Sequence, residues 1–359
     1  MSFASLWVAA LCAFTPPNQE DVGGPLRLRN EFPFHMIFLS TPPLDARIPK
    51  RKRLEVELKA VNTIAPDQVL DTAAGAQMAA ASNAGNPQPV DFAAVQAESA
   101  ARPGRTFYLA DTETWKLGFL YSHPFGEHWL LEVDAPIYAH GAGFLDSVIK
   151  SWHNAFGFPY DGRPLTPESV SQVGFFRDGR GISFGGQQGP GLGDVTVRGL
   201  YNPLEQRRWW PTTSFSAAVK VPTGDVSSLF GSGTWDGGLG LHLTRQYGQS
   251  WLYGTLGYNF HGGWRGMSQV PVRHSLDAHF GYEFRVSSAW SVVGGVSYYG
   301  SPIEASETKS VDNPATNYGF AARFNDGQRF ELEWGFVENI FRNNNSYDFG
   351  MYSRVRFWP

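Results

Sequence analysis

Residues 272–286 read VRHSLDAHFGYEFRV, and their side chains alternate between two chemical kinds. One set is largely apolar and consists of His274, Leu276, Ala278, Phe280, Tyr282, Phe284 and Val286. The other set is mostly polar or charged and consists of Arg273, Ser275, Asp277, His279, Gly281, Glu283 and Arg285. Successive side chains of a β-strand point to opposite faces, so this pattern predicts a strand with one apolar and one polar face.

The same two-residue period recurs along most of the chain. It is clearest in 53–60, 329–338 and 347–358, where apolar side chains alternate with Arg, Glu, Asp or Lys. Weaker examples lie at 106–122, 129–139, 170–184, 193–203, 213–222, 234–246, 250–260, 290–300 and 316–325. Most of these segments have about ten residues, the length that crosses a bilayer at the tilt of a barrel strand.

These segments predict an all-β fold, a transmembrane antiparallel β-barrel of about 12–14 strands with one short helical insertion. Thirteen segments carry the pattern, whereas a barrel formed by one bacterial chain should have an even number of strands. One assignment is therefore wrong. Either 32–40 is a further strand, or 170–184 is wrongly divided.

The composition agrees with a barrel and not with a helical membrane protein. Charged residues make up only 17% and aromatic residues 15% of the chain, whereas soluble chains have about 25% charged residues. The sequence contains no run of 18 apolar residues, and a membrane-spanning helix needs about 20. Barrel strands escape this test because their alternating faces average to mild hydropathy.

Connection lengths and aromatic residues predict the orientation. Short turns at 246–249, 287–288 and 325–328 alternate with long connections at 222–234, 261–271, 301–315 and 339–346. Outer-membrane barrels have short periplasmic turns and long outer loops, which would leave the chain end periplasmic. The strand ends are rich in tryptophan, and we assign a bilayer-interface girdle to Trp209, Trp210, Trp251, Trp290 and Trp358. The alternative is aromatic packing in a soluble β-sandwich.

Three regions fall outside the strand pattern. Residues 1–14 predict a signal peptide, with a buried N-terminal strand or helix as the alternative, and 15–52 form an N-terminal extension or plug before the barrel at 53–359. The Ala-, Gly- and Pro-rich stretch 66–104 is interpreted as a mobile loop with little fixed structure. Residues 143–157 have helical spacing, which indicates a lid or plug helix at the barrel mouth or a helix packed on the rim.

The polar faces supply candidate lumen-lining residues. These are Arg273, Asp277, His279, Glu283, Arg285, Arg329, Glu331, Glu333, Arg354 and Arg356. Asp277 and His279 share a face about 7 Å apart, which suits acid–base chemistry but equally suits paired charges in a polar lumen. The basic clusters at 50–53 and 207–208 are interpreted as cations that meet lipid phosphates, with a nucleic-acid patch as the alternative for the first.

No motif points to catalysis. The sequence has no G-x-S-x-G, H-E-x-x-H or P-loop pattern, and its nine histidines lack metal-ligand spacing. The net charge of −4 gives no reason to expect nucleic acid as a partner. We therefore predict neither an enzyme, nor a metal site, nor a cofactor.

Several stretches resemble a family of bacterial outer-membrane β-barrel proteins without an assigned function. They are NEFPF at 30–34, ADTET at 110–114, GFLDSVIKSWHNAFGFPYDGR at 143–163, GLGDVTVRGLY at 191–201 and VPTGD at 221–225. The last two are also similar to a broader group of barrels linked to aromatic-compound degradation and, more distantly, to long-chain fatty-acid transporters. The resemblance covers most of 26–359, excludes 66–104, and implies a barrel without implying catalytic residues.

The expected function is a passive channel or uptake porin for small molecules, with hydrophobic ones as candidates, in the bacterial outer membrane. By analogy with fatty-acid transporters, 26–46 could enter the lumen as a plug. The alternatives are a structural or surface-interaction barrel that binds partners through 66–104, and a lipid-modifying barrel enzyme. The expected partners are outer-membrane lipids, the barrel-assembly machinery and a small-molecule solute.

Overall fold

The computed structural model describes residues 22–359 except 67–68, 158–164, 168–169, 305–310, 328 and 340–344. The signal peptide expected at 1–14 lies outside the described residues. None of the described helices is both long and apolar enough to pass through a bilayer.

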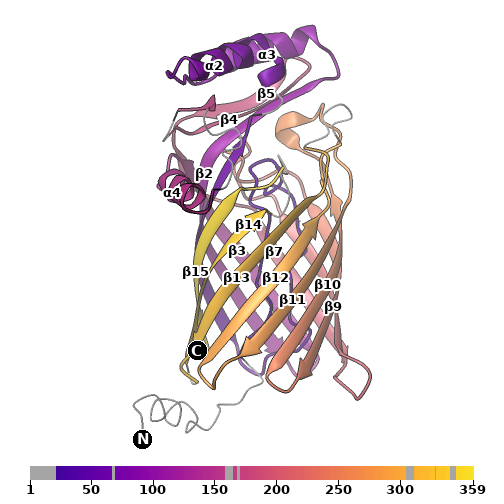
Figure 1. Ribbon diagram of the computed structural model, residues 1–359. Coiled ribbons are helices and arrows are strands. Elements are labelled where there is room, and N and C mark those ends of the chain that lie inside the picture. Colours follow the sequence, from indigo (N-terminus) through magenta and orange to yellow (C-terminus); the bar gives the residue numbers. More distant parts are fainter. Residues whose placement is uncertain are drawn as a thin grey trace, which may run out of the picture.

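Twelve antiparallel strands close into a barrel (Figure 1). In chain order they are β1 (Arg53–Ala65), β2 (Thr106–Phe125), β3 (Trp129–Gly141), β7 (Val195–Leu204), β8 (Thr212–Val221), β9 (Asp236–Tyr247), β10 (Ser250–His261), β11 (Ser275–Arg285), β12 (Trp290–Tyr299), β13 (Ala315–Asn325), β14 (Phe330–Asn339) and β15 (Phe349–Phe357). Each strand pairs with its neighbours in this order, and β1 closes the ring by pairing with β15. The structure thus confirms the predicted barrel.

The alternation in the sequence becomes the two faces of the wall. On β11, Phe280 is 57% exposed on the outside, whereas Asp277 and Glu283 on the inside are buried. The outer face of the barrel carries exposed apolar side chains on every strand, for example Leu58 of β1 and Met351 of β15. An apolar exterior around a polar interior is the arrangement of membrane barrels.

The thirteenth predicted strand, 170–184, does not belong to the barrel. It folds as a hairpin of β4 (Gln172–Arg177) and β5 (Arg180–Gly185), and β4 pairs with the end of β2 that extends beyond the barrel. Asp178 and Gly179 turn the chain with φ of 52° and 75°, values that suit a two-residue hairpin turn. The other possible strand, 32–40, is a turn inside the barrel.

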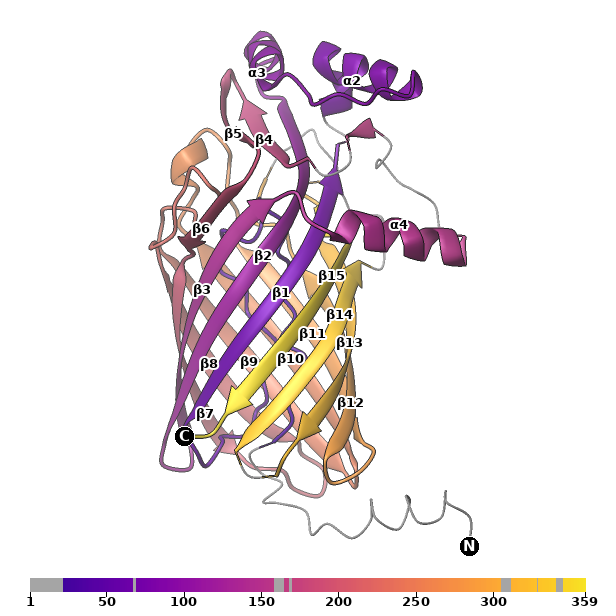
Figure 2. The ribbon, with the colours of Figure 1, turned by 90° about the vertical axis from the view of Figure 1, so that its left-hand side faces the viewer.

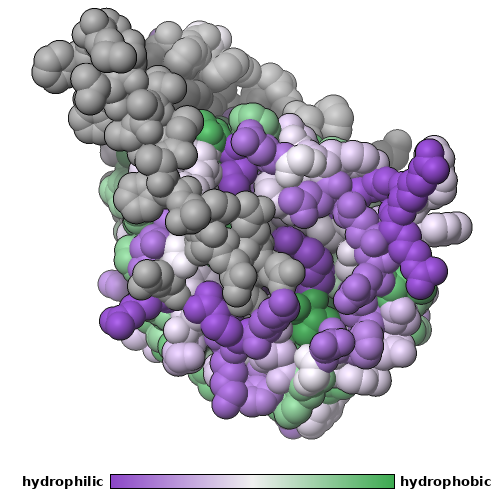
Figure 3. All heavy atoms as spheres, turned by 90° about the horizontal axis from the view of Figure 1, so that it is seen from below, coloured by the Kyte–Doolittle hydropathy of each residue, from purple (hydrophilic) through white to green (hydrophobic). Residues whose placement is uncertain are grey.

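Short turns and the C-terminus lie at one end of the barrel, and the long connections lie at the other (Figure 1). The coloured residues at the end with the short turns are mostly hydrophilic (Figure 3). We call the end with the short turns the lower end and the opposite end the mouth. At the mouth, the short strand β6 (Gln188–Leu192) pairs with the last residues of β3 and precedes β7.

The described part of 66–104, which leaves out 67–68, is folded, and this corrects the prediction of a mobile loop. It contains a short 3-10 helix, η1 (Val69–Asp71), and two α-helices, α2 (Ala73–Asn83) and α3 (Phe92–Ala101). Val69, Met78 and Val95 pack with Phe107 of β2 and Phe176 of β4 in a small core of their own. We call α2, α3, β4 and β5 the cap, because they stand above the mouth (Figures 1 and 2).

The helix predicted at 143–157 is α4 (Leu145–Phe156). It is neither a lid nor a plug. Leu145 and Ile149 pack on Ala60 of β1, beside Trp115 and Phe349, and Figure 2 shows the helix projecting from the outside of the wall near the mouth.

Candidate functional site: a plugged lumen

Residues 22–50, which we call the plug, thread the inside of the barrel. Every residue from Val22 to Pro49 is buried or half-buried. The plug enters from the lower end, turns near the mouth at 32–38, and returns to the lower end where β1 begins. The lumen therefore holds a segment of the chain and is not an open pore.

The plug backbone is held by polar groups of the wall. The N–H groups of Gly23 and Gly24 donate to Glu331 and Glu283, each at 3.0 Å. Higher in the barrel, the N–H groups of Leu39 and Thr41 donate to Asp236 and Asp277, each at 2.8 Å. Ala46 N–H donates to the Thr244 hydroxyl at 2.9 Å. Since an extended plug cannot satisfy its own backbone, these wall groups replace the water that it would otherwise bind.

The lower half of the wall carries a compensated network of buried charges. Arg323 of β13 contacts Glu283 at 2.9 Å, Glu331 at 3.3 Å and Glu333. Arg354 of β15 contacts Glu333 at 3.0 Å and also Glu57, while Arg356 contacts Glu55 at 3.2 Å and also Glu331. Buried charges are tolerated when they are paired and hydrogen-bonded, so cations and anions alternate across neighbouring strands.

Two strands from β1 along the wall, Glu132 of β3 is the centre of a second charge cluster. The plug residue Arg27 donates to both of its carboxylate oxygens, at 2.7 and 2.8 Å. Arg198 of β7 lies 3.3 Å from the same carboxylate and Arg53 lies 3.6 Å from it. One buried anion thus holds three guanidinium groups, of which one belongs to the plug.

Two cavities lie between the plug and this wall, and Arg27 lines both. The upper one, of about 60 Å³, is also lined by Lys116, Asp134 and Arg198. The lower one, of about 40 Å³, is also lined by Glu132. A cavity needs about 10–15 Å³ to hold one water molecule, so each of these two cavities has room for a few waters. The ion pair of Arg27 and Glu132 therefore contributes a residue to the lining of each cavity.

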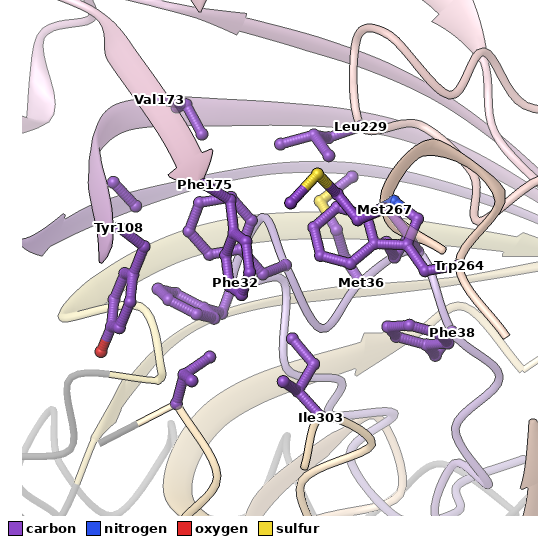
Figure 4. Close-up of a cluster of buried hydrophobic side chains, with 14 of the residues drawn as sticks. Phe32, Met36, Phe38, Tyr108, Val173, Phe175, Leu229, Trp264, Met267 and Ile303 are labelled. Carbon is purple, nitrogen blue, oxygen red and sulfur yellow. The ribbon is translucent and has the colours of Figure 1, made fainter. Parts of the chain in front are cut away.

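At the mouth, the plug turn enters a cluster of apolar side chains that we call the mouth cluster (Figure 4). Phe32, Phe34, Met36, Ile37 and Phe38 come from the plug. Tyr108, Phe175, Leu229, Trp264, Met267 and Ile303 are among those that come from β2, β4 and the long loops. The Phe34 ring packs edge-on against Phe175, with ring centroids 5.0 Å apart.

A salt bridge fastens one of the long loops over the mouth. Lys220, at the end of β8, contacts Asp194 at 2.5 Å and Asp236 at 3.4 Å. Asp194 also accepts the N–H groups of Gly224 and Ser232, at 2.8 and 3.3 Å. The loop that carries Leu229 and Phe230 into the mouth cluster is therefore tied to the wall at both of its ends.

Eight of the ten predicted lumen residues lie on the strands that face the plug. Asp277, His279, Glu283, Glu331, Glu333, Arg354 and Arg356 are buried inside the barrel, and Arg285 is half-buried at the end of β11. Arg273 and Arg329 are exposed in the connections that precede β11 and β14. For these two residues the prediction was wrong, because the alternation continues past the ends of the hydrogen-bonded strands.

Asp277 and His279 each contact the plug and do not hydrogen-bond to one another. Asp277 accepts hydrogen bonds from Thr41 N–H at 2.8 Å and Asn259 at 2.8 Å. His279 bonds the carbonyl of Thr41 and the Ser297 hydroxyl, each at 2.7 Å. Their hydrogen-bonding groups hold the plug in place. Among the described residues, no three His, Cys, Asp or Glu side chains form a group that could hold a metal ion.

Three of the five predicted interface tryptophans lie on the outside. Trp209, Trp210 and Trp290 are exposed, whereas Trp251 and Trp358 are buried. Trp251 lies on the inward side of β10, where the Arg285 guanidinium covers its ring at 4.6 Å, and Arg51 covers the Trp358 ring at 5.2 Å. The prediction was wrong for these two because it used closeness to a strand end without following the strand's alternation.

Several residues of the site were not singled out from the sequence, namely Arg27, Glu132, Asp194, Arg198, Lys220, Asp236 and Arg323. Six of them lie on strands or strand ends whose alternation was recognised, so a complete listing of each inward face would have found them. Arg27 lies in a segment without periodicity, and nothing in the sequence indicates its partner.

The first of three solved structures supports the fold. The COG4313 outer membrane channel from Pseudomonas putida F1 superimposes with a TM-score of 0.54 at 12% identity, covering 89% of this chain and 99% of that one. A Pseudomonas aeruginosa FadL homologue gives a TM-score of 0.36 at 9% identity, covering 94% of this chain and 98% of that one. The Pseudomonas putida toluene transporter TodX gives a TM-score of 0.38 at 7% identity, covering 87% and 90%.

The sequence comparisons are sparser. None of the curated protein sequences matches this chain. Residues 103–357 match the profile of a family described as "Protein of unknown function (DUF3187)".

Proposed function

The chain belongs to the DUF3187 family of proteins of unknown function, and we propose that it is an outer-membrane channel that admits small apolar molecules when its plug moves. The observation that carries this proposal is the insertion of the plug turn into the mouth cluster. Phe32, Phe34 and Phe38 occupy a pocket of aromatic, aliphatic and methionine side chains above a polar lumen.

The mouth cluster has the composition of a site that binds varied apolar molecules. Ligand pockets are lined mainly by hydrophobic and aromatic side chains. Methionine adapts its shape easily to different partners, and both Met36 and Met267 belong to the cluster. A small apolar molecule could take the place of the plug rings, because it would offer the same kind of surface to Phe175 and Trp264.

The barrel is wide enough for a small molecule to pass through once the plug is displaced. Eight-stranded barrels are filled by their own side chains, whereas barrels of about 16–18 strands enclose an aqueous channel. A 12-stranded barrel lies between these limits, so it can hold one folded segment or a narrow path. The plug bonds to the wall mainly through hydrogen bonds and ion pairs, which water can replace when it moves.

The apolar exterior supports a location in the outer membrane. Its exposed Leu, Val, Phe, Tyr and Trp side chains on every strand would contact lipid. A chain of this kind would need the barrel-assembly machinery to insert. Cell fractionation and heat-modifiable gel mobility would test the location, and recovery of a soluble cytosolic monomer would contradict it.

Locking the plug tests the channel proposal. The Thr41 hydroxyl in the plug donates to Asn259 of β10 at 2.9 Å, so Thr41→Cys with Asn259→Cys can be joined by a short bifunctional thiol reagent. The Cys12→Ser background removes the one native thiol. We expect vesicles with the reacted protein to take up a monocyclic aromatic hydrocarbon more slowly than vesicles with the unreacted protein, while each single-cysteine variant is unaffected by the reagent.

A second solute separates the possible outcomes. If a small sugar enters as fast as the hydrocarbon, the protein is a general porin and the preference for apolar molecules is wrong. If deletion of 26–46 in a correctly folded barrel leaves both uptake and single-channel conductance unchanged, the plug is not the gate and the channel proposal fails.

The folded cap favours surface interaction as a second candidate function. Helices α2 and α3 have their own small core and stand away from the barrel. Removal of 73–101 should abolish a surface phenotype if the cap binds a partner, whereas hydrocarbon uptake should persist.

A further inference from the structure

Helix α4 is fixed to the outside of the barrel at its first turn. The Leu145 N–H donates to the Glu113 carboxylate of β2 at 2.8 Å, and the Asn62 side chain of β1 donates to Asp146 at 2.9 Å. Glu113 lies on the outward side of β2, two residues from Trp115, and is almost fully buried beneath the helix. The carboxylate satisfies an N–H that has no partner within the helix and also interacts favourably with the helix dipole.

Apolar packing strengthens this attachment. Leu145 and Ile149 are buried against Ala60 of β1, with Trp115 of β2 and Phe349 of β15 around them. Phe144, just before the helix, is half-exposed, and its ring centroid lies 5.9 Å from that of Trp115. The base of α4 is therefore packed on the same outward face that carries the exposed apolar side chains of the barrel.

The attachment lies at the upper edge of that apolar face. Phe125 and Trp115 are ten residues apart on β2, which corresponds to about 33 Å along the strand. At a tilt of about 40° the projection on the barrel axis is about 25 Å, the height of the apolar band of an outer-membrane barrel. Phe119, Tyr121 and Leu58 are exposed between these levels, so α4 joins the wall where the band ends.

The helix runs outward from this point at close to a right angle to the barrel axis. Figure 2 shows it projecting beyond β15, and Figure 1 shows it nearly end-on beside the wall. In the sequence, apolar residues at 145, 148, 149, 152 and 156 share one helical face. On the other side, Ser147, Lys150, Ser151 and Asn154 are exposed.

We propose that α4 is an interfacial helix that lies along the outer surface of the membrane, with its apolar face on the lipids of the outer leaflet. An amphipathic helix parallel to the bilayer buries its apolar face about 5–10 Å deep at the boundary of headgroups and acyl chains. The continuity of the face at Leu145 and Ile149 with the apolar band identifies lipid as the partner. This inference rests on the proposed membrane location of the barrel.

Depth-dependent fluorescence quenching tests the position of α4. In a Cys12→Ser background, single cysteines are placed by Val148→Cys on the apolar side and by Ser147→Cys on the polar side. The matched references are Leu58→Cys in the apolar band and Asn83→Cys in the cap. Each full-length protein is labelled with an environment-sensitive dye and refolded into phosphatidylcholine vesicles that contain lipids with a nitroxide near the headgroup or deep in the acyl chain.

We expect the dye at 148 to lose most fluorescence with the shallow nitroxide, the dye at 58 with the deep one, and the dye at 83 with neither. The dye at 147 should be quenched less than that at 148. Quenching at 148 no stronger than at 83, with normal quenching at 58, would overturn the interfacial helix and leave the membrane barrel intact. Absence of quenching at 58 would contradict the membrane location itself. A blue shift at 148 only after addition of native outer-membrane protein would identify a protein partner and overturn the lipid proposal.

Discussion

Arg27 of the plug and Glu132 of the wall form a buried ion pair in which one guanidinium nitrogen donates to both carboxylate oxygens, at 2.7 and 2.8 Å. Arg27 lines two cavities on the same side of the plug, each with room for a few waters, and Glu132 lines the lower one. This ion pair links the plug to the strand pair β3–β7, because Glu132 lies on β3 and also pairs with Arg198 of β7. The two residues of the pair are not equivalent. Glu132 also contacts Arg53 and Arg198, whereas the salt-bridge partner of Arg27 is Glu132.

Glu132→Gln should therefore loosen the plug more than Arg27→Gln. Removing the carboxylate takes the paired anion from Arg27 and Arg198, whereas Arg53 keeps Glu55 at 2.8 Å. Breaking a buried pair costs about 3–5 kcal/mol. Removing Arg27 leaves Glu132 paired with Arg53 and Arg198. We expect a larger increase in single-channel opening and a lower unfolding temperature on gels for Glu132→Gln. Arg47→Gln is the control, because Arg47 pairs with Asp45 inside the plug. Equal effects of the two changes would contradict this ranking.

Asp194→Asn should release the loop at 222–235 from the wall. The carboxylate balances the buried Lys220 ammonium and accepts two loop N–H groups, and an amide cannot supply the charge. We expect faster cleavage of this loop by an external protease in intact vesicles. Asp225→Asn is the matched control, because Asp225 is exposed and its carboxylate accepts hydrogen bonds from Ser227 and Ser228 within the loop. Unchanged cleavage of Asp194→Asn would show that apolar packing alone holds the loop.

Phe34→Ala should weaken the packing of the plug turn in the mouth cluster without unfolding the barrel. Phe34 is fully buried against Phe175 and Tyr108, and truncation of a buried Phe costs about 3–5 kcal/mol. The barrel wall keeps its own hydrogen bonds, so we expect faster hydrocarbon uptake with unchanged heat-modifiable mobility. Phe34→Leu should lie between the wild-type protein and Phe34→Ala. Slower uptake in Phe34→Ala would mean that the ring helps to admit the solute and does not block it.

The strands were predictable because a barrel wall has two different surroundings on its two faces. The alternation in 272–286 is kept because Phe280 must face outward and Asp277 must face the plug. The hairpin at 170–184 has the same two-residue period, and only the Asp178–Gly179 turn distinguishes it from a barrel strand. Register between strands follows from this pattern, whereas the number of strands in the closed ring does not.

The cap could have been predicted from local signals that composition obscured. Alanine is the strongest helix former, and Thr72 and Asp91 accept hydrogen bonds from the first turns of α2 and α3 as N-caps. The Gly, Pro and Asn residues around 84–89 only separate the two helices. The plug is different, because an extended segment held by wall side chains has no periodicity of its own, so the partners of Arg27 or Thr41 cannot be inferred from the sequence.

Gly143→Ala should detach the first turn of α4 from the wall. A methyl group at this position would lie 1.8 Å from the carboxylate carbon of Glu113, so the side chain that accepts the Leu145 N–H would have to move. We expect the dye at 148 to become more accessible to a water-soluble quencher in the Gly143→Ala, Val148→Cys protein. Gly199→Ala is the control, because a methyl group there meets nothing within 4 Å. If the dye in Gly143→Ala stays as protected as in the parent, the lipid contact alone holds α4, and the Glu113 attachment is dispensable.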